Sequence, residues 1–433
     1  MLYSLFSYLN KVFGVSLFTY ISFRTIIAGV LALCISIWFG KSFIKWMKHH
    51  KISETQRDEK IDPAAKDKKD VPTMGGIIVI VAILLPCLLL GKLTNVYMIL
   101  MLITTVLMGA LGFADDYIKT FRKKKAGLNG WVKIAVQVTL GLIVGLTLRY
   151  SPAVTMNEVV GSHIENNTVV VDKSPEIKST QTTIPFVKRH NFNYADLFSW
   201  LGESKKYPAG WIFFVLLTVF VVAAVSNGAN LNDGMDGMCA GNSVVIGIAL
   251  LALAYMSGSV VWAEYFDVMY IPGSEEIVIF LATFIGALVG YLWWNGFPAQ
   301  VFLGDTGSLT IGGIIGVCAM SIHKELMLPI LCGVFLIESV SVIVQTRVYK
   351  FFKKRGRHVR VWRKTPLHDH FRTTIAGMKE LDPTCTFFFS NDRNIILDSD
   401  GKPDKRFEPK IVLRFCIVTL ILATMTILTL KIR

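Results

Sequence analysis

The sequence predicts an all-α polytopic membrane protein that forms a single integral membrane domain over residues 1–433. The first observation is composition, since 53% of the 433 residues are hydrophobic and the mean hydropathy is +0.51. A water-soluble enzyme of this length is far less apolar. The second is a series of apolar runs near the length of about 18 residues that crosses a bilayer. The third is that Lys and Arg gather in alternate loops between these runs.

About ten apolar runs are candidates for transmembrane helices. They are 25–44, 73–90, 96–114, 132–148, 211–229, 239–256, 277–294, 309–322, 327–348 and 411–430. The eighth is short and rich in glycine, so its sequence supports a span least. In the ninth, Pro329 and Gly333 are positions where a helix bends, and Glu338 is expected to face protein or water.

The loops that follow odd-numbered runs hold most of the basic residues, in 45–69, 119–125 and 347–364. The positive-inside rule places these loops in the cytoplasm and both termini outside. On this parity, five carboxylates and two histidines lie on the cytoplasmic side: Asp115, Asp116, Asp233, Asp236, Asp305, His368 and His370. Carboxylates gathered at one membrane border indicate a shared cation or a shared polar substrate.

Several classes of protein are disfavoured by composition. The net charge of +14 does not indicate nucleic-acid binding, because the basic residues flank apolar spans, where they set topology and contact anionic lipids. Six of the seven cysteines lie in or at the ends of spans, which argues against a disulfide framework or a zinc site. The first residues are expected to form an interfacial amphipathic segment rather than a removable signal peptide.

Two stretches are long and polar enough to be insertions. Residues 151–183 are rich in Asn, Thr, Val and Ser, and they predict an external loop that is either a β-hairpin or irregular. Residues 379–408 predict a small cytoplasmic hairpin with a turn at 398–401. No internal repeat is evident, which weakens the case for an inverted-repeat transporter.

Adjacent carboxylates, Asp115 and Asp116, stand where the third apolar run ends. Neighbouring side chains on a helix diverge by about 100°, so one could hold a cation and the other a reacting group. The alternative is an ordinary acidic helix end. Carboxylates at a helix C-terminus oppose the macrodipole, however, and therefore need another reason to be there.

Two glycine-containing motifs follow the fifth and seventh runs. Residues 230–237 place two aspartates in a bent loop that suits Mg²⁺ or a nucleotide, although such a loop also fits a helix-capping turn. Residues 295–309 place Asp305 in a flexible turn whose backbone amides could approach phosphate. The alternative for this second motif is a loop in which Ser308 caps a helix.

Basic and imidazole side chains complete the inventory. Residues 366–371 place His368 and His370 around Asp369, which suits polar contacts to phosphate better than metal binding, because no Cys or third His lies nearby. An exposed turn is the alternative. Carboxylates, amides and bases at one membrane face are the inventory of Mg²⁺-dependent phosphoryl transfer. The lysine candidates, each of which could instead set topology or contact lipid, are Lys68, Lys119, Lys123 and Lys133.

Together the motifs resemble the phospho-N-acetylmuramoyl-pentapeptide transferase family, within the polyprenyl-phosphate N-acetylhexosamine-1-phosphate transferase superfamily. The resemblance implies a ten-helix homodimer in the bacterial inner membrane, with periplasmic termini and a cytoplasmic active-site cleft. It implies transfer of phospho-MurNAc-pentapeptide from UDP-MurNAc-pentapeptide to undecaprenyl phosphate, with Mg²⁺ as cofactor. Lipid I for peptidoglycan synthesis and UMP would be the products. The resemblance is carried by residues 72–76, 112–119, 230–237, 295–308, 366–371 and 411–415.

The resemblance also implies roles for individual residues. Asp305 matches the Mg²⁺ ligand. Asp115 and Asp116 match an acidic pair that faces the lipid phosphate, where Asp115 accepts its proton or aligns it. Asn295 and Phe302 match positions that hydrogen-bond and stack on uracil. The other matched positions are the catalytic His368 and His370 and the substrate-binding Lys68, Thr73, Lys119, Lys123, Lys133, Asn230, Asp233, Gly234 and Asp236.

One departure and two rival functions remain. Asp369 stands where the family usually has the second of three histidines, so it either weakens a phosphate contact or recruits a counter-cation. The nearest rival is a polyprenyl-phosphate N-acetylhexosamine-1-phosphate transferase, although residues 72–76 and 366–371 favour the muramoyl enzyme. A transporter of anionic substrates is the other, but it would place ionisable residues near mid-span rather than at the span ends.

Overall fold

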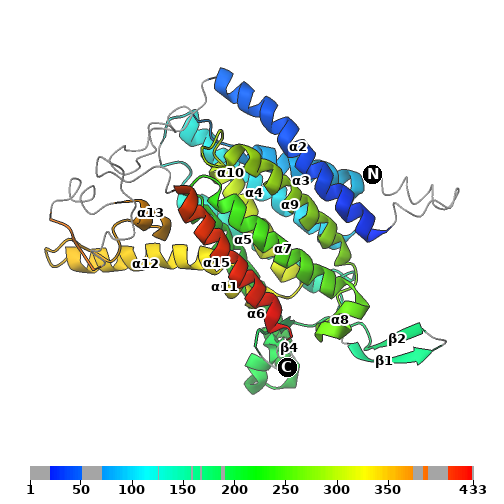
Figure 1. Ribbon diagram of the computed structural model, residues 1–433. Coiled ribbons are helices and arrows are strands. Elements are labelled where there is room, and N and C mark those ends of the chain that lie inside the picture. The colour runs from blue at the N-terminus through cyan, green and yellow to red at the C-terminus, as the bar shows by residue number, and fades with distance from the viewer. Residues whose placement is uncertain are drawn as a thin grey trace.

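The computed structural model describes residues 20–50, 71–124, 126–157, 159–165, 168–186, 191–373, 384–388 and 408–431. Most of these residues lie in helices that run side by side in one bundle (Figure 1). The helices that match the predicted runs are α2 (Ile21–His49), α3 (Gly76–Leu90), α4 (Val96–Thr120), α5 (Gly130–Tyr150), α6 (Glu203–Leu231), α7 (Met238–Gly258), α9 (Glu275–Asn295), α10 (Gly304–Ser321), α12 (Gly333–Lys353) and α15 (Glu408–Thr429).

Every predicted run overlaps one of these helices, and seven of them are long and apolar enough to cross a membrane. The seven are α2, α4, α5, α6, α7, α9 and α15. The all-α, multi-pass prediction is therefore confirmed, whereas length and composition support seven or eight spans rather than ten. Helix α3 has only 15 residues.

Helix α10 lies inside the bundle, and every residue from Thr306 to Ser321 is buried. This position accounts for the weak span signal of its sequence, because glycines that face neighbouring helices replace the large apolar residues that face lipid. A Cβ on Gly76 would overlap the backbone of Gly307, and a Cβ on Gly112 would overlap the backbone of Asp305. Helices α3 and α4 therefore approach the start of α10 at backbone distance.

The ninth run is not one straight helix. It begins as a 3₁₀ turn, η3 (Glu325–Met327), and a short helix, α11 (Leu328–Leu331), and it then bends by 75° into α12. The break at Cys332 separates α11 from α12, which places Pro329 and Gly333 on either side of it as predicted. Glu338 is fully buried, so the expectation that it faces protein is also confirmed.

Short strands and helices occupy the connections. Strand β1 (Val159–Glu165) pairs antiparallel with β2 (Thr168–Lys173), which confirms a β-hairpin within residues 151–183. The turn predicted at 398–401 lies outside the described residues. The remaining elements are β3 (Gln181–Thr183) antiparallel to β4 (Asn191–Asn193), β5 (Val359–Arg360) parallel to β6 (Thr386–Phe387), the 3₁₀ helix η2 (Tyr194–Leu201), α8 (Val260–Phe266) and α13 (Leu367–Arg372).

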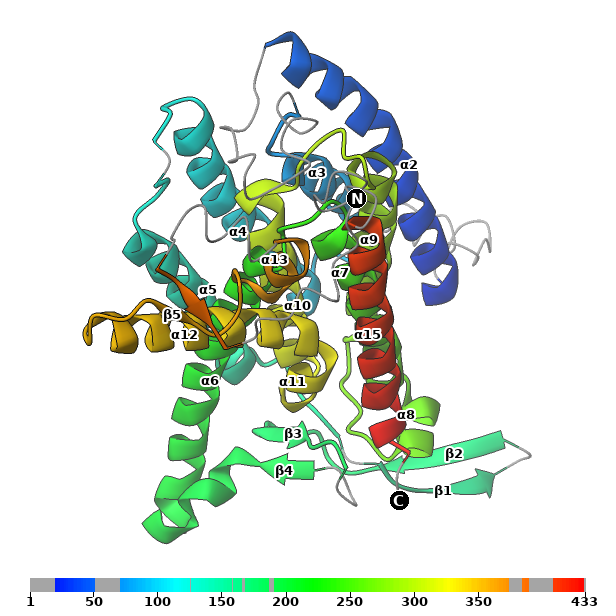
Figure 2. The same cartoon turned by 60° about the vertical axis from the view of Figure 1, so that its left-hand side comes forward.

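The connections separate to opposite ends of the bundle. Strands β1, β2 and β4 lie at one end of the bundle and α13 lies toward the other (Figure 1), and Figure 2 shows β3 beside β4 at the strand end. Helix α12 points away from the bundle, and β5 lies beside it (Figure 2). Successive connections between the long helices alternate between the two ends, as the charge of the loops predicted. The starts of α5, α7 and α10 therefore lie at the same end of the bundle as α13.

A buried polar cluster fastens the strand end to the turn that precedes η3. The hydroxyl of Tyr194 donates to Glu325 Oε1 at 2.8 Å, and Lys324 Nζ donates to Thr183 Oγ1 at 2.6 Å. The backbone N–H of Thr183 donates to the carbonyl of His323 at 3.1 Å. Buried polar groups are stable when they are paired in this way. The cluster therefore fixes the segment from which the bent helix starts.

His323 gives this cluster a pH dependence. Burial, reinforced by neighbouring Lys324, lowers the pKa of His323 to about 4 from 6.5. As the pH falls below 6.5 the unfolded chain takes up the proton first, so stability is lost between the two pKa values. We expect the wild type to lose about 2 kcal/mol more unfolding free energy than His323→Phe between pH 6.5 and about pH 4.5. The measurement is thermal unfolding of both proteins in detergent, and equal pH slopes would contradict the assignment.

Candidate active site

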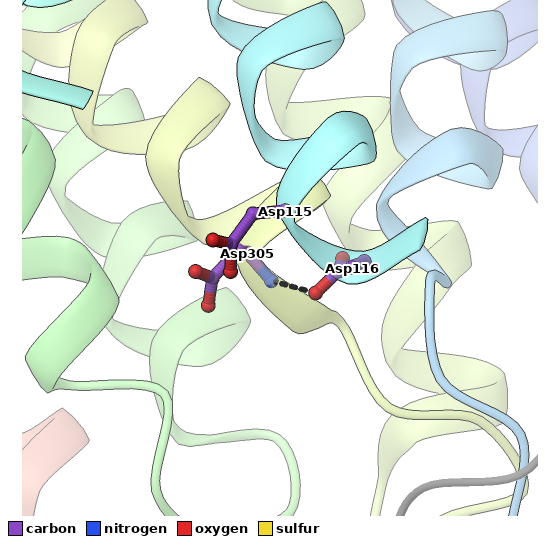
Figure 3. Close-up of side chains that lie close together, drawn as sticks. All are labelled: Asp115, Asp116 and Asp305. Atoms are coloured by element: carbon purple, nitrogen blue, oxygen red, sulfur yellow. Dashed lines mark hydrogen bonds between the residues drawn. The ribbon is translucent and has the colours of Figure 1, made fainter. Parts of the chain in front are cut away.

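Asp116 holds the start of α10. Its Oδ1 accepts from the backbone N–H of Asp305 at 3.1 Å (Figure 3). Its Oδ2 accepts from the backbone N–H and the hydroxyl of Thr306 at 2.9 and 2.6 Å. The first amides of a helix have no partner inside it and carry the positive end of its dipole. A carboxylate at the end of α4 therefore has a reason to be there, namely the adjacent start of α10.

Asp115 points the other way, toward the carboxylate of Asp305 (Figure 3). Lys119 Nζ lies 2.6 Å from Asp115 Oδ2 and 3.1 Å from Asp305 Oδ2. Lys133 Nζ lies 3.0 Å from Asp115 Oδ1 and 2.7 Å from Asp305 Oδ2. The two lysines thus bridge the two carboxylates, which are contributed by α4 and α10. The predicted divergence of the acidic pair is observed, with one side chain in the charged cluster and the other on a helix start.

Asn230 joins this cluster from the end of α6. Its Nδ2 donates to Asp305 Oδ1 and to Ser308 Oγ, both at 2.9 Å. The Ser308 hydroxyl in turn donates to the carbonyl of Gly304 at 2.9 Å. Both oxygens of the Asp305 carboxylate are therefore held by side chains from α4, α5 and α6, which fixes the carboxylate at the first turn of α10.

The segment ahead of α3 pairs with the segment ahead of α10. The backbone N–H of Gly75 donates to the carbonyl of Phe302 at 2.8 Å, and the N–H of Phe302 donates to the carbonyl of Pro72 at 2.8 Å. Gly304 follows at φ +71°, and a Cβ there would lie 2.5 Å from Asp116 Oδ2 and 3.2 Å from Thr73 Oγ1. Thr73 is therefore brought beside the acidic residues, and only glycine fits between them without strain.

The loop after α6 packs on the loop after α9. The carboxylate of Asp236 accepts from the N–H of Ala299 at 3.1 Å. Asn295 Oδ1 accepts from the N–H of Gly237 at 3.0 Å, and Asn295 Nδ2 donates to the carbonyl of Val301 at 2.8 Å. Asn295 and Asp236 are both buried, so each is engaged in holding these two loops together.

The histidine motif reaches the same loop through α13. His368 packs on Gly234 so closely that a Cβ on Gly234 would overlap its Nε2. His370 Nδ1 accepts from the backbone N–H and the Nε of Arg363 at 3.2 and 3.3 Å. Of the two histidines, His368 is therefore the one that the structure places against the predicted nucleotide loop.

Asp369 forms ion pairs within its own segment. Its Oδ1 lies 2.6 Å from Arg372 Nη2, and its Oδ2 lies 2.8 Å from Lys364 Nζ. Burial opposes ionisation of this carboxyl, but Arg372, with His368 and Lys364, holds its pKa below the ordinary value. Of the two effects considered for Asp369, the structure shows recruited counter-cations, and these are side chains of the chain itself.

The remaining predicted residues are placed less directly. Lys68 lies outside the described residues. Lys123 is exposed, at φ +52°, in the turn that follows α4. Phe302 is partly buried and takes part through its backbone. Asp233 is partly buried in the loop between α6 and α7.

Sequence reasoning did not find several residues that shape the site. Thr306 binds Asp116, and the backbone N–H of Leu128 donates to Asp115 Oδ1 at 2.7 Å. Glu338 accepts from the backbone N–H of His368 at 3.2 Å. Thr306 stands next to Asp305, and its position in the first turn of a helix was a local signal that could have identified it. Leu128 is 13 residues from Asp115 and Glu338 is 30 residues from His368, so no pattern within a few turns of chain reveals these two contacts.

The carboxylates suit a hard divalent cation. Asp115, Asp116 and Asp305 each offer one oxygen, and these oxygens lie within 4.8 Å of one another. Carboxylate oxygens are the ligands that Mg²⁺ takes. The oxygens of Asp116 accept from the start of α10, whereas Asp115 and Asp305 are held mainly by the ammonium groups of Lys119 and Lys133, whose charge a bound cation would replace, so these two offer the better donor pair.

Comparison with known proteins gives this geometry a family. The profile described as glycosyl transferase family 4 matches residues 98–323, which include both Asp115 and Asp305. A Phocaeicola vulgatus protein named phospho-N-acetylmuramoyl-pentapeptide-transferase is 58% identical over the full length of both chains. The chain belongs to the phospho-N-acetylmuramoyl-pentapeptide transferase family. Proteins of the same name from Bacteroides thetaiotaomicron and Porphyromonas gingivalis are 56% and 46% identical, again over the whole of both chains.

Membership of the transferase family confirms the resemblance that six motifs predicted. The names of these relatives favour the muramoyl enzyme over the N-acetylhexosamine alternative and over a transporter. Since the relatives match along their entire lengths, the insertion-like segments 151–183 and 379–408 fall within the matched region.

Proposed function

We propose that this protein transfers phospho-MurNAc-pentapeptide from UDP-MurNAc-pentapeptide to undecaprenyl phosphate, which yields lipid I and UMP for peptidoglycan synthesis. The observation that carries the proposal is the 58% identity, over the full length of both chains, to a protein named for this transfer. The cluster of Asp115, Asp305, Lys119 and Lys133 supports it, because phosphoryl transfer needs carboxylates and cations held in place beforehand.

In this reaction an oxygen of the lipid phosphate attacks the β-phosphorus of the sugar nucleotide. A new P–O bond forms to the lipid phosphate, while the bond from the β-phosphorus to the bridging oxygen breaks. UMP leaves with that electron pair. Asp305, with Asp115, would hold Mg²⁺, which would neutralise charge on the diphosphate when bound. Lys119 and Lys133 turn from the carboxylates toward the phosphates as these enter.

The two members of the acidic pair have different tasks. Asp115 accepts the proton of the lipid phosphate, or aligns that phosphate, because its carboxylate faces Asp305 and the lysines. Asp116 orients Asp305 by fixing the first turn of α10. Asp116 is thus a positioning residue.

The nucleotide binds beside this cluster. Asn230 approaches it from the end of α6, Asp233 and Gly234 from the loop that follows, and Phe302 offers an aromatic face for uracil. Asp236 and Asn295 support the nucleotide by holding the two loops together, and Asn295 would have to exchange one of its internal hydrogen bonds to reach the base itself. Further contacts to the phosphates come from the basic and polar side chains of Lys68, Thr73, Lys123, His368 and His370.

The site faces the cytoplasm, and the chain crosses the bacterial inner membrane ten times with both termini in the periplasm. Loop charge supports this orientation, since Lys119 and Lys364, from two of the basic loops, pair with Asp305 and Asp369 at the end of the bundle that carries the acidic cluster. The short helix α3 and the buried helix α10 complete the ten spans. The active assembly is a homodimer in contact with membrane lipids.

Choice of sugar nucleotide separates the proposal from its nearest rival. Purified protein with undecaprenyl phosphate and Mg²⁺ is expected to release UMP from UDP-MurNAc-pentapeptide at least about 100-fold faster than from UDP-GlcNAc, because a site built around one substrate leaves polar groups unpaired with the other. Release of UMP is measured in parallel reactions. A preference for UDP-GlcNAc would support the N-acetylhexosamine alternative instead.

A further inference from the structure

Glu338 is a buried carboxylate in α12 that the proposed reaction does not use. Its side chain is completely inaccessible. Oε1 and Oε2 accept from the backbone N–H of His368 at 3.2 and 3.4 Å, and Oε2 lies 3.3 Å from His368 Nδ1. Among the residues that the structure describes, no Lys or Arg forms an ion pair with Glu338. A buried, charged carboxylate is costly unless it is paired, and its partner here is His368.

The other edge of the imidazole is closed as well. His368 Nε2 faces Gly234 in the loop after α6, where a side-chain carbon would overlap the ring. Asp369 Oδ1 lies 3.6 Å from the same nitrogen, but Asp369 is already paired with Lys364 and Arg372. Glu338 is therefore the carboxylate available to His368, on its Nδ1 side.

Helix α12 supports the whole segment that carries the histidines. Two turns beyond Glu338, Gln345 Oε1 accepts from the N–H groups of Val361 and Trp362, and Gln345 Nε2 donates to the carbonyl of Trp362 at 3.1 Å. Glu338 and Gln345 are seven residues apart, so they lie on one face of the helix. The opposite face exposes large apolar side chains, including Leu336, Val340 and Ile343. One helix thus joins an apolar outer surface to the segment that contacts the nucleotide loop.

We propose that Glu338 is a positioning residue that acts through His368. Its carboxylate holds the backbone and the Nδ1 edge of His368, so that Nε2 stays directed at the Gly234 loop, where the ring in its doubly protonated form donates to the substrate diphosphate. A carboxylate beside Nδ1 orients the ring and favours a proton on that nitrogen, so Nε2 donates only when the ring carries both protons. This inference rests on the proposed function and extends it to a residue in the bent ninth span.

A double-mutant cycle tests the coupling. Glu338→Gln retains an oxygen for the backbone N–H of His368 but removes the charge, and it is expected to lower kcat about 30-fold while KM for UDP-MurNAc-pentapeptide changes less than about threefold. His368→Asn is expected to lower kcat about 100-fold. The double variant should match His368→Asn within about threefold, because a positioning residue has nothing left to position. If Glu338→Gln does not fold, the cycle is repeated with Glu338→Asp.

Glu276 provides the matched control. It is a buried glutamate in α9 that pairs with Arg24 Nη2 at 2.8 Å and accepts from the N–H of Lys92 at 2.9 Å, at the other end of the bundle. Glu276→Gln should lower the unfolding temperature. It should change kcat by the same factor whether position 368 carries His or Asn. If Glu338→Gln changed kcat by the same factor with His and with Asn at position 368, the inference about Glu338 would be overturned, while the proposed function would stand. A wild-type protein that released no UMP would overturn the proposed function itself.

Discussion

Replacing Asp305 with Asn is expected to lower the rate of UMP release by about 10³-fold, at the upper end of the effect of removing one electrostatic group from an active site. The substitution removes the charge that Lys119 and Lys133 share with Asp115, and it removes the best-held oxygen donor for a divalent cation. The variant is also expected to bind Mn²⁺, a spectroscopic substitute for Mg²⁺, more weakly in an electron paramagnetic resonance titration.

The control for Asp305 is Asp196, an exposed aspartate in η2 at the opposite end of the bundle. Asp196→Asn should leave the rate of UMP release and the Mn²⁺ affinity unchanged. An Asp305→Asn protein that bound Mn²⁺ and turned over like the wild type would remove Asp305 from the metal site.

Asp115→Asn is expected to lower kcat by about 10²- to 10⁴-fold, the range for loss of a general base. Asn can still accept from the N–H of Leu128, so the fold around position 115 should be retained. The rate of UMP release at saturating substrates and the unfolding temperature are measured together. Near-normal turnover would refute the proposed task of Asp115 at the lipid phosphate.

Asp116→Ala serves as the contrast, because the side chain of Asp116 is occupied by the start of α10. Its loss leaves two buried amides and the hydroxyl of Thr306 without their acceptor. Each unsatisfied group costs about 1 to 3 kcal/mol. We therefore expect a larger fall in unfolding temperature for Asp116→Ala than for Asp115→Asn. If Asp115→Asn lowered the unfolding temperature more than Asp116→Ala, the proposed tasks of Asp115 and Asp116 would have to be exchanged.

Local sequence patterns predicted the helices and the residues of the site, because both leave signals within a few turns of chain. The length of the apolar runs predicted every long helix. The charge of the loops predicted that the acidic motifs lie at the same end of the bundle. The glycine-rich eighth run gave a weak signal for a physical reason, since α10 faces other helices rather than lipid. A count of spans by length and hydropathy stops short of ten, because α10 faces other helices and α3 has only 15 residues.

Contacts between distant segments could not be predicted in this way. The sequence showed that Asp116 opposes the dipole of its own helix, but the compensating helix start lies 189 residues away. The bend of 75° was expected near Pro329 and Gly333, whereas its consequence for Glu338 and His368 depends on how α12 and α13 pack. Asn295 was assigned to the base by motif, and only the three-dimensional contacts reveal that its amide also joins two loops.

The most direct test of the central claim is the identity of the lipid product. Purified protein is incubated with UDP-MurNAc-pentapeptide and Mg²⁺, with and without undecaprenyl phosphate, and both UMP and the lipid fraction are measured by mass spectrometry. The proposal predicts one undecaprenyl diphosphate-MurNAc-pentapeptide for each UMP, and neither product without the lipid phosphate. UMP released at the same rate without undecaprenyl phosphate, or with no new lipid, would contradict it.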